Sequence, residues 1–591
     1  MSNPSSYSRA AEDLRENPGQ WAAYESTGHC VMLAGPGSGK TKTLTLKMAR
    51  MLDQDVHDPR GIACITYNNE CARELEARLS DLGVEPGGRV FVGTVHSFSL
   101  TQIILPYAKT AQMGLPNDFR VATRKERAVA LERAYNKVIG GRDNPQNLDF
   151  AMGTYRRSIL NRDSDVWRQR DPNMAALVEE FERQLRELGC IDFDDMPLLA
   201  MRALQRADWL PKALLAKYPV LIVDEYQDLG RALHRMVMGL CFNTGMRLFA
   251  VGDADQSIYS FNGANPRLLQ DLAQRDDVET VRLRLNYRSG SEIVRASNFA
   301  LGEQRDYEAA AGAQLGVVYF HPMTGAYANQ AIKVFKEILA DIGRRDTGLK
   351  LGDIAIVYPE AWMGDGIAHI AQRAQIPFIR ADKKSLYPRA SSIMRWLERC
   401  AVWSVTGWKT GSPRFSQITE EGSRLFAEII DTNEAKVDFQ RKVVQTLWTM
   451  RDESIPLSNW LSNVRTNITA DIIDRCRGMK DEGEVLDTFI LRTNPDGDCS
   501  EMTLGQFAGQ SNQSGSLNLS TLHSAKGREF KYVVMFGMDK GRIPRADATE
   551  EARRLFYVGF TRAKSEVHIV FTKTNPSPFV LEVQQRLVES A

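Results

Sequence analysis

The segment AGPGSGKT, residues 34–41, carries residue types and a spacing that suit phosphate binding. Its glycines let backbone N–H groups point at a phosphate without clashes from Cβ atoms, and a helix that starts directly afterwards adds its partial positive charge. Lys40 is expected to reach the β- and γ-phosphates of a nucleotide, and the hydroxyl of Thr41 to bind Mg²⁺. The expected nucleotide-binding residues of this loop are Gly35, Gly37, Ser38, Gly39, Lys40, Thr41 and Lys42.

A second segment, YPVLIVDEYQDL (residues 218–229), reads as a continuous apolar strand that ends in carboxylates, as expected of a buried parallel strand opposite the glycine loop. Asp224 is expected to hold Mg²⁺. Glu225 is expected to orient and deprotonate the attacking water, which is the general-base role of an ATPase. Carboxylates at the end of a strand commonly belong to a solvated turn, but together with the glycine loop they predict hydrolysis of ATP with Mg²⁺.

Elements of two kinds must position these residues. Short β-rich runs alternate with amphipathic helical stretches through residues 29–100 and 218–285, and this texture returns after residue 353 and again after residue 516. Such alternation predicts parallel α/β sheets, and the intervening stretches read as helical insertions. The predicted bounds are 1–105 and 197–285 for a first α/β domain, 106–196 for its insertion, 286–403 and 511–591 for a second α/β domain, and 404–510 for its insertion.

The composition is that of an ordinary folded protein. The chain has 591 residues, enough for roughly three to five domains, with 43% hydrophobic and 25% charged residues. Its net charge of +1 does not by itself indicate a nucleic-acid partner. The eight cysteines form no C-x-x-C pair, and the sequence contains no apolar leader or membrane-spanning run. These features predict a cytoplasmic protein without a zinc site.

The chain resembles the UvrD/Rep/PcrA family of superfamily 1A DNA helicases. DEYQD is this family's form of the carboxylate box, and further boxes follow in the family's order over most of the chain. Gln20 stands upstream of the glycine loop at the family's spacing. The matching segments are 65–79, 93–98, 191–195, 251–264, 285–293, 521–530 and 550–564. The resemblance implies two RecA-like domains and an ATP-driven motor that moves 3′ to 5′ on single-stranded DNA.

The resemblance also implies roles at the nucleotide. Tyr287 would stack on adenine, and Gln20 would hydrogen-bond the edge of the base. Arg288 and Arg562, on the second domain, would contact the γ-phosphate as arginine fingers, because a guanidinium binds phosphate oxygens in a fork. The remaining implied contacts are Gln256 as a γ-phosphate sensor and Glu529 near the sugar.

For DNA, the resemblance implies stacking of bases on aromatic rings, a mode that tolerates any sequence. The matching aromatic residues are Tyr67, Phe193, Tyr259 and Phe261, and further strand contacts are His96, His523 and Lys526. The implied substrates are single-stranded DNA and tailed duplexes.

The sequence departs from the family's pattern at several places. Ala34 replaces the first glycine of the loop, Glu70 replaces a lysine, and Asn262 replaces an arginine that normally helps to couple nucleotide to DNA. The insertion at 404–510 is shorter than is usual. This compactness is similar to that of accessory helicases that work beside a separate nuclease, such as the helicase subunit of Gabija-type phage-defence systems.

Two alternatives to an autonomous helicase stay open. One is an ATP-gated subunit that binds or senses DNA for a partner nuclease or other effector and unwinds little, which Asn262 and the small insertion favour. The other is a P-loop kinase or NTPase without nucleic acid, which the ordered boxes disfavour. ATP turnover with and without DNA, and strand displacement, distinguish the three.

Overall fold

The protein folds into two compact units. The first comprises Met1–Tyr319, Ile543–Val567 and Ser577–Ala591, and the second comprises Phe320–Arg542 and His568–Pro576. The structure, a computed structural model, describes residues 6–66, 69–84, 88–162, 164–260, 263–302, 305–382, 385–388, 391–476, 479–509, 515–545 and 550–590.

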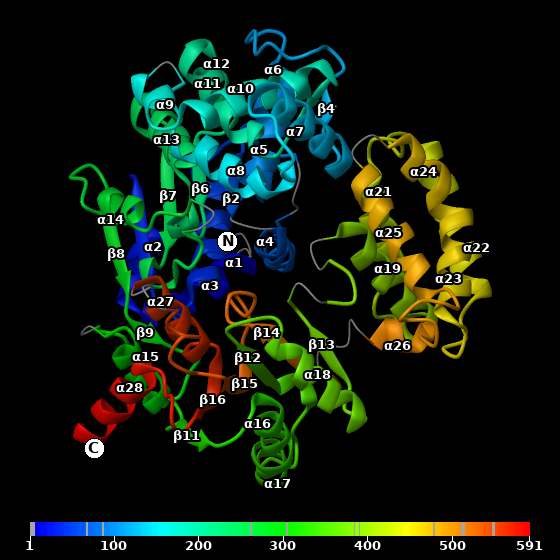
Figure 1. The fold of residues 1–591 in the computed structure, drawn as a ribbon. Coiled ribbons are helices and arrows are strands. Elements are labelled where there is room, and N and C mark those ends of the chain that lie inside the picture. Colours follow the sequence, from blue (N-terminus) through cyan, green and yellow to red (C-terminus); the bar gives the residue numbers. More distant parts are fainter. Residues whose placement is uncertain are drawn as a thin grey trace. The chain divides into compact units, whose positions relative to one another are not determined.

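The first unit contains a six-stranded sheet with the strand order β3-β2-β6-β7-β1-β8 (Figure 1). All neighbouring strands in it are parallel. Because parallel strands end at the same edge of a sheet, the C-terminal ends of β1, β7 and β6 lie next to one another, and a ligand site is expected there. The strands are β1 Cys30–Ala34, β2 Ile62–Thr66, β3 Val90–Thr94, β6 Val220–Val223, β7 Arg247–Gly252 and β8 Glu279–Leu283.

Both faces of this sheet are buried under helices. Successive side chains of a strand point to opposite faces, so Val31 packs with Met236 of α13 in one hydrophobic cluster, while Met32 packs with Leu44 and Met48 of α3 in another. The apolar residues of the helix after the glycine loop therefore face the sheet. The helices are α2 Pro18–Glu25, α3 Lys40–Arg50, α4 Asn69–Asp81, α11 Asp195–Arg206, α12 Trp209–Lys217, α13 Arg231–Met238 and α14 Arg267–Ala273.

Later parts of the chain complete the first unit. Helix α15 packs against α27 and α28, and the rings of Phe556 and Phe579 lie 5.8 Å apart between their centroids. These elements bring residues near the C-terminus into the unit that holds the glycine loop. Their bounds are β9 Leu285–Asn286, β10 Glu308–Ala309, α15 Ser291–Ala300, α27 Glu550–Phe560 and α28 Pro578–Glu589.

A helical region lies in the chain between β3 and α11. Its core holds the fully buried Trp167 and Phe181. Helix α7 starts with a capping box in which Thr123 and Glu126 satisfy each other's backbone N–H groups. The elements are α7 Arg124–Val138, α8 Asp149–Ser158, α9 Asp165–Gln169, α10 Pro172–Glu187 and the two short paired strands β4 Arg120–Val121 and β5 Cys190–Ile191.

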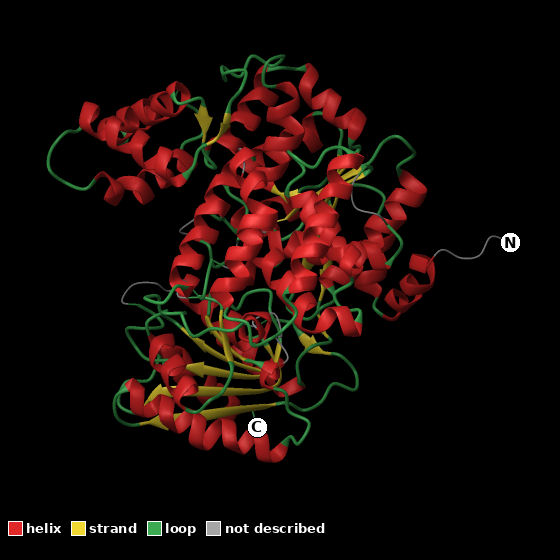
Figure 2. Cartoon of the chain, turned by 90° about the vertical axis from the view of Figure 1, so that its right-hand side faces the viewer, coloured by secondary structure: helices red, strands yellow, loops and turns green. Residues whose placement is uncertain are grey.

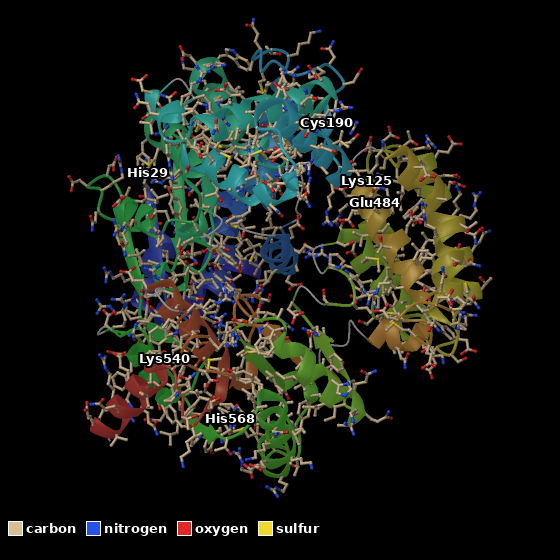
Figure 3. The ribbon with its side chains drawn as sticks, in the orientation of Figure 1. His29, Lys125, Cys190, Glu484, Lys540 and His568 are labelled. Carbon is tan, nitrogen blue, oxygen red and sulfur yellow. The ribbon has the colours of Figure 1, made fainter. Side chains whose placement is uncertain are left out.

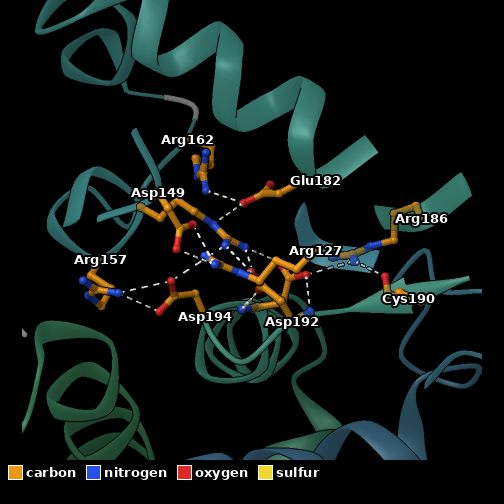
Figure 4. Close-up of polar contacts among 11 residues, drawn as sticks. Arg127, Asp149, Arg157, Arg162, Glu182, Arg186, Cys190, Asp192 and Asp194 are labelled. Atoms are coloured by element: carbon orange, nitrogen blue, oxygen red, sulfur yellow. Dashed lines mark hydrogen bonds and ion pairs between the residues drawn. The ribbon is translucent and has the colours of Figure 1, made fainter. Parts of the chain in front are cut away.

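A buried ion cluster joins this helical region to the start of α11 (Figure 4). Arg156 is 0% exposed and donates to Asp192 at 2.7 Å, to Asp195 at 2.8 Å and to Glu182 at 3.1 Å. Burial alone would raise the pKa of Asp192, but the guanidiniums of Arg156 and Arg127 hold it below its usual value. Burial and the charge of Asp192 raise the pKa of Asp195. Arg156 is the arginine that all three carboxylates share, and each also pairs with one further arginine: Asp192 with Arg127, Asp195 with Arg186 and Glu182 with Arg162.

The second unit contains most of a second six-stranded sheet, with the order β11-β16-β15-β12-β14-β13 (yellow strands in Figure 2). Strand β12 is parallel to both β14 and β15. His568 of β16, labelled in Figure 3, stacks on His321 of β11 with a ring nitrogen separation of 3.0 Å. The strands are β11 Val317–Met323, β12 Ile354–Tyr358, β13 Phe378–Arg380, β14 Leu517–Thr521, β15 Phe530–Phe536 and β16 Ala563–Thr572. Its helices are α16 Tyr327–Lys333, α17 Ala340–Arg345 and α18 Met363–Arg373.

A second helical region lies in the chain between β13 and β14. Its own core contains the fully buried Trp396 and Trp460, and the indole of Trp396 donates to the carbonyl of Ile418 at 3.0 Å. None of the helices in the described part of the chain is both long and apolar enough to cross a membrane. The main helices are α19 Ser392–Val402, α21 Phe415–Leu425, α22 Asn433–Thr449, α23 Leu457–Val464, α25 Lys480–Thr493 and α26 Leu504–Gly509.

Arg156→Met should destabilise the first unit strongly, at a cost of about 3–5 kcal/mol, because it removes the fully buried guanidinium that Asp192, Asp195 and Glu182 share and leaves each with one arginine partner. Arg157→Met is the matched control. The pair of Arg157 with Asp194 is partly exposed, at 31% and 18%, so removing it should cost about 1 kcal/mol or less. Urea unfolding followed by tryptophan fluorescence measures both, and an equal fall in stability for the two variants would contradict the prediction.

Candidate functional site

The loop Gly35–Gly39 joins β1 to α3 and has the backbone of a phosphate cradle. Gly37 and Gly39 have φ values of +69° and +82°, in the left-handed region that glycine adopts freely. The hydroxyl of Ser38 donates to the carbonyl of Gly35 at 2.7 Å and closes the turn. The loop thus presents concave backbone at the N-terminus of an eleven-residue helix, which is a favourable site for an anion.

Gln20 contacts this loop directly. Its side chain is buried on α2, and its amide nitrogen donates to the carbonyl of Ser38 at 2.8 Å. A Cβ atom at Gly39 would lie 2.4 Å from the same nitrogen, so a larger residue there would displace Gln20. Gln20 therefore lies beside the loop, where the sequence predicts it.

Tyr287 and Arg288 also lie beside the loop. The backbone N–H of Tyr287 donates to the carbonyl of Gly37 at 2.8 Å, and its hydroxyl accepts a hydrogen bond from Asn17 at 3.0 Å. Its ring is 51% exposed and so is available for stacking. A Cβ atom at Gly37 would lie 2.6 Å from the Cβ of Arg288, which shows how closely this segment approaches the loop.

Asp224 and Glu225 follow β6 at the same edge of the sheet. The N–H of Asp224 donates to the carbonyl of Ile65 at 2.9 Å, and Glu225 has an unusual φ of +53°. Burial and the charge of Glu225 raise the pKa of Asp224 to about 7, against the opposing charge of Lys40. A cation bound beside these two adjacent carboxylates would balance their negative charge. The hydroxyl of Thr41, in the first turn of α3, supplies another oxygen donor.

A series of hydrogen bonds links Glu225 to Arg562 through three intervening residues. Gln227, which is fully buried, donates to Glu225 and accepts the backbone N–H of Asp253 at 2.9 Å. Gln256 donates to Asp253 and accepts from Nη2 of Arg562 at 3.0 Å. Burial raises the pKa of Asp253 to about 6. All the residues of this hydrogen-bonded series lie within the first unit. The structure thus brings together Gln256 and Arg562, both of which are predicted to contact the γ-phosphate.

Arg562 and Arg288 both donate hydrogen bonds to Thr561. Arg562 is 2% exposed and donates to the carbonyl of Val558 at 3.0 Å and to the hydroxyl of Thr561 at 2.9 Å. Arg288 donates to the carbonyl of Thr561 at 3.2 Å. The two predicted arginine fingers therefore lie side by side, and each is held by backbone or side-chain acceptors.

Two residues that sequence reasoning missed support the same site. Arg305 forms a two-pronged ion pair with Asp255, at 2.9 and 2.8 Å, directly beside Gln256. The hydroxyl of Tyr307 donates to Asp255 at 3.4 Å, and its ring covers Gly35 so closely that a Cβ there would lie 2.4 Å away. Neither residue belongs to a motif. Since their partners are about 50 and 270 positions away in the chain, no sequence pattern could have indicated them.

A cavity of about 370 Å³ lies at the predicted DNA side of the first unit and is lined in part by His96, Arg157 and Asp194. The ring of Phe193, 58% exposed, meets that of His96 edge-on with centroids 5.9 Å apart. Burial lowers the pKa of His96, with Asp194 opposing. A neutral imidazole and an exposed phenyl ring suit contact with a base.

Other predicted residues are placed differently or are not described. Tyr67 and Phe261 lie outside the described residues. Tyr259 is partly buried after η7, a short turn at Ala254–Gln256. The ammonium of Lys42 binds Asp13 at 2.9 Å, so its side chain pairs at the surface instead of pointing into the loop.

His523, Lys526 and Glu529 belong to the second unit. All three lie on the loop between β14 and β15, where the N–H of Lys526 donates to the carbonyl of His523 at 3.3 Å. Glu529 is exposed, and the other two are partly buried. The structure thus places these three residues on one loop, and their nucleotide and DNA roles stay predictions.

Comparison with known proteins gives consistent matches over the chain. Residues 16–276 match the family of the UvrD/REP helicase N-terminal domain, and residues 433–574 match that of the UvrD-like helicase C-terminal domain. The chain is 26% identical to the ATP-dependent DNA helicase Rep of Escherichia coli, over 97% of this chain and 94% of Rep. It is 24% identical to the ATP-dependent DNA helicase PcrA of Staphylococcus epidermidis (96% and 86% covered) and 26% identical to the putative ATP-dependent DNA helicase YjcD of Bacillus subtilis (93% and 77%).

Arg305→Met should loosen the turn that carries Gln256, because it removes both bonds to Asp255. Hydrogen bonds to charged groups contribute about 1.5–3 kcal/mol, with a discount here because Arg305 is 32% exposed. Hydrogen exchange of residues 253–257 should become faster. Arg284→Met is the control, since its pair with Asp306 is 58% and 50% exposed. Unchanged exchange in the Arg305 variant would contradict the prediction.

Proposed function

This chain belongs to the UvrD/Rep helicase family, and on that basis we propose that it is an ATP-dependent DNA helicase that moves 3′ to 5′ along single-stranded DNA. The near full-length similarity to Rep and PcrA, both named as ATP-dependent DNA helicases, supports the activity. The direction rests on the order and identity of the sequence boxes. We further propose two RecA-like domains with the bounds predicted from the sequence, each with its helical insertion.

The hydrogen bond between Arg562 and Gln256 carries the proposal. It joins a residue near the C-terminus to the strand edge that holds Glu225, through Gln227 and Asp253. A γ-phosphate in the glycine loop would carry negative charge that a guanidinium binds strongly. Release of that phosphate would remove the anion that Arg562 binds. The same series of hydrogen bonds connects Arg562 to the general base Glu225. Hydrolysis is thereby linked to the position of the C-terminal segment.

The chain's own residues have defined tasks in this proposal. The loop backbone and Lys40 bind the phosphates, Tyr287 stacks on the adenine, and Glu225 takes the proton of the attacking water. Thr41 and Asp224 would hold Mg²⁺, because oxygen donors suit this ion. Burial, together with the charge of Glu225, raises the pKa of Asp224, and a bound cation would favour its charged form. The ion, when bound, would neutralise charge on the phosphates.

The DNA contacts are proposed on both units. In the first unit, His96 lines a cavity and contacts the exposed ring of Phe193, on which a base could stack. Tyr67, Tyr259 and Phe261 are proposed to stack on neighbouring bases, and His523 and Lys526 of the second unit to contact the strand. Stacking reads no sequence, which suits a motor that passes along any DNA.

Unwinding of matched 3′-tailed and 5′-tailed duplexes tests the proposal directly, with ATP turnover followed in the same samples. We expect the 3′-tailed duplex alone to open. Glu225→Gln should lower turnover by about 10²–10⁴-fold, the usual contribution of a general base, and should abolish unwinding while ATP still binds.

Opening of the 5′-tailed duplex would refute the direction, and absence of DNA-stimulated turnover would refute the motor. If DNA stimulates turnover but neither duplex opens, the alternative function holds, namely an ATP-gated DNA-binding subunit of a nuclease or phage-defence complex. The short second helical region, proposed at 404–510, is the feature that favours this alternative.

Arg562→Lys should lower ATP turnover by about 10³-fold or more, since a lysine keeps the charge but lacks the fork that stabilises the transition state. Arg554→Lys, on the preceding helix α27, is the control because Arg554 pairs with the exposed Glu550. Binding of a fluorescent ATP analogue and the melting temperature report whether the site stays folded. A turnover for Arg562→Lys within a few-fold of wild type would contradict the finger role.

A further inference from the structure

Four arginines converge on a second cavity of the first unit. The cavity measures about 370 Å³ and lies among α11, α13 and the segments 111–113 and 160–162. Its described lining residues are distinct from those of the glycine loop and of the cavity beside His96. The four residues are Arg162, Arg202, Arg206 and Arg235.

Among the described residues, the lining of this cavity includes no aspartate or glutamate. The nearest counter-charge in the described part of the chain is Glu182, which accepts from Arg162 at 2.7 Å (Figure 4). The same oxygen of Glu182 also accepts from Arg156 at 3.1 Å. Among the described residues, the carboxylate of Glu182 is thus shared by Arg162 and Arg156, and Asp195 also attracts Arg202 electrostatically. The four arginines of the described lining still outnumber these carboxylates.

Arg202 shows the imbalance most clearly. Within the described residues it has no hydrogen-bond or ion-pair partner, and its Nη2 atom is buried without an acceptor, as is Nε of Arg162. Burial, together with the charges of nearby arginines, lowers the pKa of both side chains. Buried donors in native proteins nearly always have acceptors. These two donors belong to residues that line the same positive cavity, and a bound anion would supply acceptors for them.

We propose that this cavity is a binding site for a phosphate group, separate from the nucleotide bound at the glycine loop. Guanidiniums bind phosphate oxygens through paired, charge-assisted hydrogen bonds. Arg162 and Arg202 form the partly buried floor, and the exposed Arg206 and Arg235 form the rim. The amides of Asn161 and Gln205 add neutral donors.

A second cavity adjoins the proposed phosphate site and enlarges the surface on which a phosphorylated ligand can lie. A neighbouring cavity of about 660 Å³ shares Gln205 and Arg235 with the first and adds Lys212 and Asp208. The phosphate could therefore come from a free phosphorylated molecule or from the backbone of a nucleic-acid strand that follows this groove. Both sources present the same chemistry. The proposal goes beyond the helicase function and depends on none of its catalytic residues.

Isothermal titration of the full-length protein with inorganic pyrophosphate tests the site, after saturation of the glycine loop with a non-hydrolysable ATP analogue and Mg²⁺. We expect one additional binding event. The double variant Arg202→Gln with Arg235→Gln should weaken it by roughly tenfold or more, because removal of one hydrogen bond to a charged ligand has about that effect. Arg133→Gln, an exposed arginine of α7 outside the cavity, should leave it unchanged.

A second arm identifies the source. Affinity for an oligothymidylate is measured against salt concentration, because removing one phosphate contact with a single strand lowers the slope of this dependence by about 0.7. A lower slope in the double variant supports the site with nucleic acid as its ligand. Weaker pyrophosphate binding at an unchanged slope supports it with a free phosphorylated ligand. If neither changes relative to Arg133→Gln, the proposal is overturned.

The melting temperature without added anion separates a binding role from a structural one. Arg202 makes no stabilising pair with any described residue, so Arg202→Gln should melt at or above the wild-type temperature, and pyrophosphate should raise the melting temperature of the wild type more than that of the variant. A clear fall in the melting temperature of the anion-free variant would mean that Arg202 stabilises the fold, and would overturn the proposal.

Discussion

The hydrogen bond from Arg562 to Gln256 is the contact on which the arrangement of the site depends. The guanidinium of Arg562 is almost fully buried, and a buried charge is stable only when nearly all its donors have acceptors. Its acceptors are Val558 at the end of α27, the adjacent Thr561 and Gln256. Gln256 is in turn held by Asp253, whose own charge is disfavoured by burial. The segment before β16 is therefore tied to the sheet edge by polar requirements, and apolar packing alone does not explain its place.

The glycine loop imposes a second constraint from the opposite side. It is covered by residues distant in sequence, with Gln20 against Gly39, Arg288 against Gly37 and the ring of Tyr307 against Gly35. Each approach leaves no room for a Cβ atom, so the glycines serve the protein's own packing as well as any phosphate. These contacts help to explain why residues 286–319, which the sequence places in a second α/β domain, belong to the compact unit of the first sheet.

The fold class and the family could be predicted from the sequence, and both are confirmed. The glycine loop and the strand before Asp224 are local patterns, in which the strand, turn and helix are specified by neighbouring residues. The Arg156 cluster and the pairing of Arg305 with Asp255 could not be predicted, because surface arginines and buried ones look alike in sequence and their partners lie far away. For the same reason the sequence pattern includes Lys42 in the nucleotide loop, although its side chain pairs with Asp13. The individual roles of site residues stay predictions.

Two arginines, one on α8 and one on α11, differ in their counter-charges and therefore in what their burial implies. Arg156 has three carboxylates within hydrogen-bond distance and serves to hold the helical region to α11. Arg202, on α11, has no carboxylate within hydrogen-bond distance among the described residues, and the neighbouring arginines add like charge. Desolvation of a guanidinium without a hydrogen-bonded counter-ion opposes folding, so we expect Arg202 to weaken the anion-free protein. A residue that costs stability in this way is explained most simply by a ligand that supplies the missing negative charge.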